Sequence, residues 1–207
     1  MHISDGVLPT TVAVGGFAVS LAIVAWTGRK VDPEDLPKIA VVTSAFFVAS
    51  LIHVPIGPTS VHLLIPGLVG ILLGNGAFIS IGLGIILQSL LFQFGGITAI
   101  GANACMMGVP ALVSGWLFRT MKGRSLSRHV VAGALAGGLG VFMATLILAL
   151  FLLSGGEDFF GVAKIAIYAH LPVFVIESAV SAFVVSFLFK VKPDMLGRET
   201  ASVSPFC

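Results

Sequence analysis

Seven apolar stretches, separated by short segments that carry most of the charged residues, dominate this chain of 207 residues. Only 10% of the residues are charged, whereas a soluble domain carries about 25%. So few charges cannot cover a soluble surface, and most of these stretches approach the ~20 residues that a bilayer-spanning helix needs. The sequence therefore predicts an all-α polytopic membrane helix bundle with about seven transmembrane segments, at residues 8–27, 38–54, 62–74, 77–94, 103–119, 129–154 and 163–190.

Two of these segments have features of their own. The third is short and contains Pro66, which favours either a half-length helix or a buried re-entrant segment. The sixth contains "AGALAGGLG", where Gly133 and Gly137 have the spacing of close helix contacts in membranes. We expect a single transmembrane metal-binding domain over residues 1–192, for the reasons given below, and a disordered cytoplasmic tail over residues 193–207.

The basic residues predict the orientation. Asp5 precedes the first apolar stretch and Arg29–Lys30 follow it, which is the reverse of a secretory signal peptide. With the N-terminus outside and the C-terminus in the cytoplasm, every Lys and Arg except Lys164 falls on the cytoplasmic side, as the positive-inside rule requires. This topology leaves His129 in the cytoplasm and places the other histidines at the outer end: His2, His53, His62 and His170.

Several functions find no support in the sequence. The net charge of +2 is small and scattered, so we expect no nucleic-acid partner. The two cysteines, Cys105 and Cys207, have no zinc-site spacing. The chain contains no G-x-x-x-x-G-K-[ST] phosphate loop, so any ATP hydrolysis has to come from partner subunits. An intramembrane metal-dependent enzyme is the alternative reading, against which the motifs H-E-x-x-H and G-x-S-x-G are both absent.

The first two residues, Met1 and His2, form a potential metal chelate. The terminal amine, the backbone nitrogen of His2 and its Nδ1 can close two fused chelate rings, with the nitrogens in one plane, once the amide proton is displaced. Cu(II) and Ni(II) favour such planar nitrogen fields, and one further imidazole would complete a square-planar site. The alternative is that His2 is an exposed residue at a frayed end.

A histidine at the outer end is the expected fourth ligand. His62 lies in "PIGPTSVHLLIPG", whose prolines and glycines predict an irregular loop that returns into the bundle. Such backbone is tolerated at membrane depth where it lines a cavity in the protein. Ser60 in the same loop is a candidate for supporting the site, whereas His53 ends the second apolar stretch and is interpreted as interfacial.

Other polar residues are candidates for supporting the ligands. His170 and Glu177 share one face of the last segment, and an ionisable group at the depth of Glu177 indicates a functional site unless it bonds a neighbouring helix. The loop "FGGITAIGAN" is placed to close over the site, with Thr98 or Asn103 as partners of a ligating histidine. Asp5, in the polar opening of the chain, completes this set.

Four motifs resemble the CbiM/NikM family: "MHISDG", "TSVHLLIPGLVGILLG", "LLFQFGGITAIGAN" and "HLPVFVIES". The members are the substrate-binding membrane subunits of energy-coupling-factor (ECF) transporters for cobalt and nickel. The resemblance implies a seven-helix bundle with its N-terminal segment in the centre, and a metal bound by Met1, His2 and the loop histidine His62. It also implies a transmembrane coupling subunit, two ATP-binding subunits and a small accessory membrane subunit. Phe94 stands where many relatives have a histidine, so no role of that histidine is carried over.

We therefore expect a cell-membrane transport subunit, not an enzyme, that captures Ni(II), or alternatively Co(II), from outside through four nitrogens. Nickel is favoured because a planar field with an anionic amide nitrogen suits Ni(II). No organic cofactor is expected. A passive channel is disfavoured, because binding by four nitrogens is too tight for the rapid exit that conduction requires.

Overall fold

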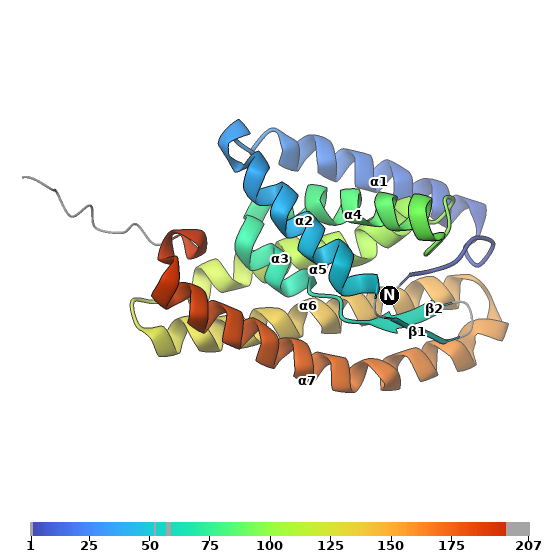
Figure 1. The fold of residues 1–207 in the computed structure, drawn as a ribbon. Coiled ribbons are helices and arrows are strands. Elements are labelled where there is room, and N and C mark those ends of the chain that lie inside the picture. The colour runs from blue at the N-terminus through green and yellow to red at the C-terminus, as the bar shows by residue number, and fades with distance from the viewer. Residues whose placement is uncertain (1, 52, 57–58, 198–207) are drawn as a thin grey trace, which may run out of the picture.

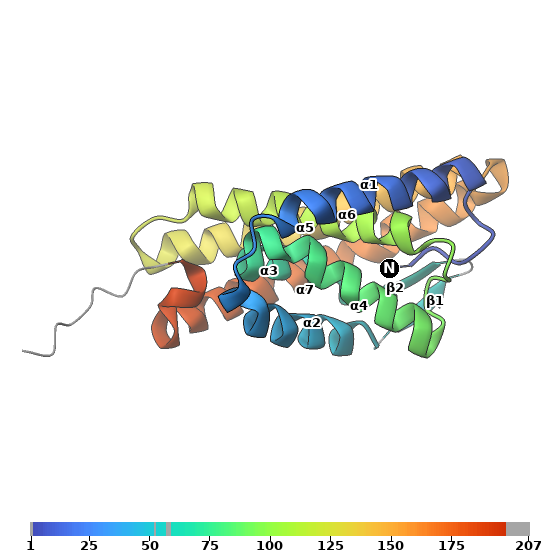
Figure 2. The same ribbon diagram turned by 90° about the horizontal axis from the view of Figure 1, so that it is seen from above.

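The computed structural model describes residues 2–51, 53–56 and 59–197, with side chains at 2–51 and 62–197. Within these residues the chain forms seven α-helices: α1 (Thr10–Gly28), α2 (Leu36–Leu51), α3 (Pro66–Leu73), α4 (Ala77–Phe92), α5 (Ile100–Met121), α6 (Leu126–Ser154) and α7 (Phe160–Val191). Four short 3-10 helices lie between or after them: η1 (Pro33–Asp35), η2 (Gly74–Gly76), η3 (Glu157–Phe159) and η4 (Pro193–Leu196). Helix α5 is central and packs on α1, α3, α4 and α6, while α6 and α7 form a long antiparallel pair (Figures 1 and 2).

A β-hairpin follows α2, and the sequence did not predict it. Strands β1 (His53–Ile56) and β2 (Thr59–His62) are antiparallel, and their register pairs His53 with His62. The predicted segments at 38–54 and 62–74 are therefore too long, since α2 ends at Leu51 and α3 begins at Pro66. Proline fits the first turn of a helix because a backbone N–H at that position would have no partner within the helix, so its absence costs little.

Among the described residues, five segments are long and apolar enough to cross a membrane: Thr10–Gly28, Pro66–Phe92, Ile100–Met121, Leu126–Ser154 and Glu157–Val191. Helices α3 and α4 count as one segment through η2, and α2 is shorter than the others. Large apolar side chains stay exposed on the outside, such as Leu21 at 67% and Phe183 at 74%, as expected of a surface that faces lipid. The chain is a multi-pass integral membrane protein, while seven crossings and the orientation remain predictions.

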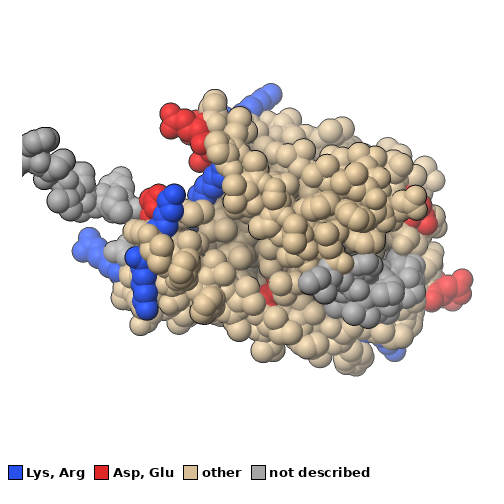
Figure 3. Space-filling model, viewed as in Figure 1, with Lys and Arg blue, Asp and Glu red and all other residues tan. Residues whose placement is uncertain are grey.

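Lysine and arginine side chains gather at one end of the bundle, around η1, η4 and the loop between α5 and α6 (Figure 3). Here Lys122 Nζ donates hydrogen bonds to the carbonyl oxygens of Leu196 at 2.7 Å and Gly197 at 3.1 Å. The first residues of the predicted tail 193–207 are therefore folded as η4, while residues 198–207 lie outside the described part of the chain.

Glycines allow the helices to approach closely. A Cβ atom at Gly133 would lie 2.9 Å from the Val185 side chain, and one at Gly137 would collide with Ser181, both on α7. The contact predicted for these two glycines is thus confirmed. A Cβ at Gly70 of α3 would likewise collide with the backbone of Ala111 in α5. These contacts pack α3 tightly against α5 and α7 against α6, and α7 carries the carboxylate of Glu177, which bonds the backbone just before α3.

Candidate metal site

The N-terminal segment runs into the bundle instead of fraying outside it (Figure 1). His2 is 4% exposed and Ile3 is fully buried. The backbone N–H of Ile3 donates to Asn103 Oδ1 at 2.9 Å, and Asn103 Nδ2 donates to the Ile3 carbonyl at 3.1 Å. A side-chain amide of α5 therefore pairs with the backbone as a neighbouring strand would, so the alternative of an exposed, frayed His2 is wrong.

Asp5 fastens the other end of this segment to the loop before α5. Its carboxylate accepts hydrogen bonds from the backbone N–H of Thr98 at 2.8 Å and of Ile97 at 3.2 Å, and from the Thr98 hydroxyl. These hydrogen bonds hold the pKa of the exposed Asp5 below its usual value of 3.8, and the bond from the Thr98 hydroxyl has the largest effect. Desolvation acts in the opposite direction. Gly96, at φ +68°, has no room for a side chain because its Cβ would collide with the Asp5 carboxylate. Asp5 and Thr98 thus position the segment that carries His2.

The structure brings together His2 of the N-terminal segment and His62 at the end of β2. Their rings are stacked, with centroids 5.0 Å apart and planes at 24°. His62 Nδ1 lies 2.9 Å from the Leu63 carbonyl, which can only accept, so Nδ1 carries the proton. The other ring nitrogen, Nε2, is buried without a hydrogen-bond partner among the described residues, which leaves its lone pair available to a cation.

Glu177 holds the backbone that follows His62. Its Oε1 accepts hydrogen bonds from the N–H groups of Leu64 and of Ile65, the latter at 2.8 Å. Ile65 has the left-handed conformation, at φ 44° and ψ 26°, which is strained for a β-branched residue. The sequence left open whether Glu177 has a functional role or bonds a neighbouring helix. In the structure, its buried carboxylate bonds the backbone of the turn before α3.

His170 lies on the same face of α7 as Glu177 and is also buried, at 2% exposure. Its Nδ1 donates to the Ala166 carbonyl at 2.7 Å, and its Nε2 is buried with no hydrogen-bond partner in the described part of the chain. Both residues thus lie in the interior of the bundle.

Some predicted site residues lie outside what the structure describes: Met1 and the side chains of His53 and Ser60. Among the described residues, no group of three or more His, Cys, Asp or Glu side chains is arranged to hold a metal ion. The predicted ligand set differs from such a group, because two of its nitrogens belong to the backbone of Met1 and His2.

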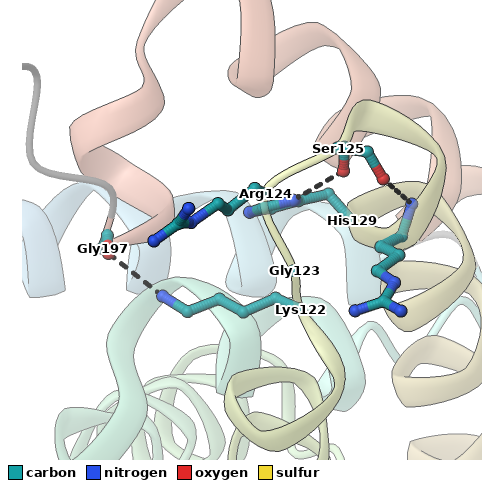
Figure 4. A pocket seen from close by; sticks show the side chains of 7 residues that line it. Lys122, Gly123, Arg124, Ser125, His129 and Gly197 are labelled. Atoms are coloured by element: carbon teal, nitrogen blue, oxygen red, sulfur yellow. Dashed lines mark hydrogen bonds between the residues drawn. The ribbon is translucent and has the colours of Figure 1, made fainter.

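A basic cavity lies beside the loop between α5 and α6 (Figure 4), and this loop is at the end of the bundle away from the N-terminus (Figure 1). The cavity has a volume of about 700 Å³, and its lining includes Lys122, Arg124, Arg128 and His129. The His129 ring packs edge-on against Phe118 and Phe189, with centroids 6.0 and 4.8 Å away. Positive side chains repel a metal cation, so this cavity is not a second candidate for the metal site.

Sequence reasoning missed two residues that contact the candidate site directly or through one partner. Gln88 of α4 is fully buried, and its Oε1 lies 2.6 Å from His2 Nε2. Ser50 of α2, also fully buried, accepts a hydrogen bond from Gln88 Nε2. A side-chain amide within the apolar stretch 77–94 was the available signal, because an amide in such a segment needs a polar partner.

The fold and this polar interior define a multi-pass membrane protein whose N-terminal histidine meets a second histidine inside the helix bundle. A family model described as the cobalt uptake substrate-specific transmembrane region, CbiM, matches residues 2–195. The chain therefore belongs to the CbiM family and is a membrane component of metal uptake.

Individual proteins agree with this assignment. A putative metal transport protein of Haemophilus influenzae is 35% identical over 201 residues, which cover 96% of this chain and 98% of that protein. A putative fused nickel transport protein, NikMN, of Archaeoglobus fulgidus is 29% identical over 97% of this chain and 70% of its own length. A crystal structure of a truncated transition metal transporter superposes with a TM-score of 0.79 at 27% identity, over 92% of this chain and 99% of that one.

Proposed function

We propose that the chain is the substrate-specificity subunit of an ECF-type ABC importer and captures Ni(II), or alternatively Co(II), from outside. The observation that carries this proposal is the pair of buried rings of His2 and His62, with centroids 5.0 Å apart. Metal–imidazole bonds are about 2 Å long and lie in the plane of the ring, so an ion at the edges of two rings this close could bind a nitrogen of each.

The ligands in this proposal are the Met1 amine, the backbone nitrogen and Nδ1 of His2, and Nε2 of His62. The His62 Nδ1–H bond to the Leu63 carbonyl supports the choice of Nε2 on that ring. A planar field that includes a deprotonated amide suits Ni(II). Because Cu(II) binds such ligands more tightly, selection for nickel also depends on which metals are available.

Energy for transport comes from other chains in this proposal, since the sequence has no phosphate-binding loop. The partners are a transmembrane coupling subunit, two ATP-binding subunits and a small accessory membrane subunit. The family match and the relatives named as transport proteins support a transport role. No observation favours the alternative of an intramembrane metal-dependent enzyme.

The absorption spectrum and magnetic moment of the purified chain with one equivalent of Ni(II) test this function. A planar four-nitrogen site gives a yellow, diamagnetic complex that lacks the weak bands of octahedral nickel. A paramagnetic, six-coordinate spectrum would contradict the proposed ligand set. The same titration with Co(II) compares the two candidate substrates.

A further inference from the structure

We propose that Gln88 is a positioning residue that fixes the tautomer of His2, so that Nδ1 is the nitrogen presented to the metal. This inference rests on the proposed function and adds a residue to the machinery of capture. Gln88 contacts the ring of His2 at 2.6 Å and is fully buried in α4.

The direction of the hydrogen bonds begins at Ser50. Its hydroxyl oxygen lies 2.7 Å from the Phe47 carbonyl oxygen, and since a carbonyl can only accept, the hydroxyl hydrogen lies between them. The Ser50 oxygen is then left to accept, and it does so from Gln88 Nε2. Ser50 therefore determines which way round the amide of Gln88 is placed.

The oriented amide in turn decides where His2 carries its proton. With its nitrogen on Ser50, Gln88 presents Oε1 to His2 Nε2, and this oxygen can only accept. His2 Nε2 must therefore be protonated. A neutral imidazole has one N–H, so Nδ1 keeps its lone pair.

This tautomer is the one that the chelate requires. Nδ1 is the ring nitrogen nearer the backbone, so it can bind the same ion as the amide nitrogen of its own residue. Nε2 points away from that nitrogen. Since His62 is protonated on Nδ1 instead, the two stacked rings are opposite tautomers, and a different ring nitrogen keeps its lone pair in each.

Because these side chains are buried, the protein and not the solvent determines the hydrogen bonds that fix the tautomer of His2. Gln88 and Ser50 are both fully buried, so water has little access to replace the oxygen that faces His2. Partners of this kind orient a ligating histidine, and their removal commonly lowers metal affinity by about 10- to 100-fold.

Nitrogen-15 NMR of the full-length, histidine-labelled protein in detergent, without metal, tests the tautomer, with His2→Ala used to assign the signal. Wild type should show a protonated Nε2 and an unprotonated Nδ1 for His2. Gln88→Leu should show a mixture of tautomers and about 10- to 100-fold weaker Ni(II) binding. Gln88→Glu keeps an oxygen acceptor and should restore the wild-type tautomer and most of the affinity.

Ser89→Ala is the matched control, because Ser89 is a buried neighbour of Gln88 whose hydroxyl has no hydrogen-bond partner among the residues that the structure describes. It should leave both measurements unchanged. If Gln88→Leu does not fold, Ser50→Ala takes its place, since it removes the group that orients the amide. A wild-type His2 protonated on Nδ1, or an unchanged tautomer in the variant, would overturn the inference. Octahedral nickel in the wild type would instead reject the proposed function, and with it a role for Gln88 in capture.

Discussion

The side chain of Asn103 holds the backbone of Ile3 by two hydrogen bonds, one accepted at 2.9 Å and one donated at 3.1 Å. The residues are 100 positions apart, and both are fully buried. Asn103 Nδ2 also donates to the Gly95 carbonyl at 3.3 Å, so one side chain joins α5, its preceding loop and the N-terminal segment.

Asn103→Leu is expected to release this segment. The N–H and carbonyl of Ile3 lose their partner inside the protein, at a cost of about 1–3 kcal/mol for each buried polar group left unsatisfied. Thermal unfolding in detergent should show the loss of stability, and Ni(II) titration should show weaker binding. The same substitution at the exposed Asn75 serves as the control. Equal effects at the two positions would contradict a specific role of Asn103.

An N-terminal extension is expected to abolish nickel uptake. It converts the proposed Met1 amine into a peptide amide, which binds metal only after a second deprotonation, and it adds volume beside the buried His2. The same tag placed after residue 207 should leave uptake unchanged. Uptake by cells that express verified, uncleaved N-terminally tagged protein measures the effect, and full activity would falsify the role of the terminus.

Two buried histidines allow a matched comparison of the ends of the bundle. His62 is 4% exposed and His129 is fully buried. His62→Ala should remove tight Ni(II) binding because it deletes a proposed ligand, whereas His129→Ala should lower thermal stability with binding unchanged. Calorimetric titration of both variants distinguishes a ligand from a packed ring. A loss of binding in His129→Ala equal to that in His62→Ala would contradict the site.

The pH dependence of stability should report on Asp5. Its pKa is lowered in the folded protein, first by the Thr98 hydroxyl, so its ionised form stabilises the fold. This contribution is fully present above the unfolded pKa of about 4 and is lost as the pH falls through the lower folded value. The difference in thermal stability between wild type and Asp5→Asn should therefore be constant near neutral pH and shrink in acid. A difference that is independent of pH would show that the carboxylate charge contributes nothing.

Glu177 is expected to support His62 through the backbone. Glu177→Ala leaves the N–H groups of Leu64 and Ile65 without their acceptor, at about 1–3 kcal/mol for each, and should weaken Ni(II) binding. Glu177→Gln keeps an oxygen and should have the smaller effect. Glu157→Gln, on the exposed η3, is the control for loss of a carboxylate. Equal Ni(II) affinities in the Ala and Gln variants would argue against a role of Glu177 in holding this backbone.

The helices and the pairing of His2 with His62 could be predicted from the sequence, since apolar length and the donor chemistry of residues 1 and 2 are local properties. The hairpin could not, because "PIGPTSVH" has the composition of an irregular loop, and its strands of four residues each carry little pattern. Gln88 was missed for a different reason. Its role depends on Ser50 and His2, which come from two other parts of the chain and meet it only in the folded bundle.

The close contact between α1 and α5 has a mechanical consequence. At Gly16 and Gly101 the two backbones touch with no room for a Cβ, and Ser20 Oγ donates to the Gly101 carbonyl at 2.7 Å. Most of the apolar surface of α1 is exposed, as expected of a helix that faces lipid. The segment that carries His2 leads directly into this helix. The contact with α5 thus fixes the position of α1 and, through it, of the segment that carries His2, so that any displacement of α1 would also displace His2.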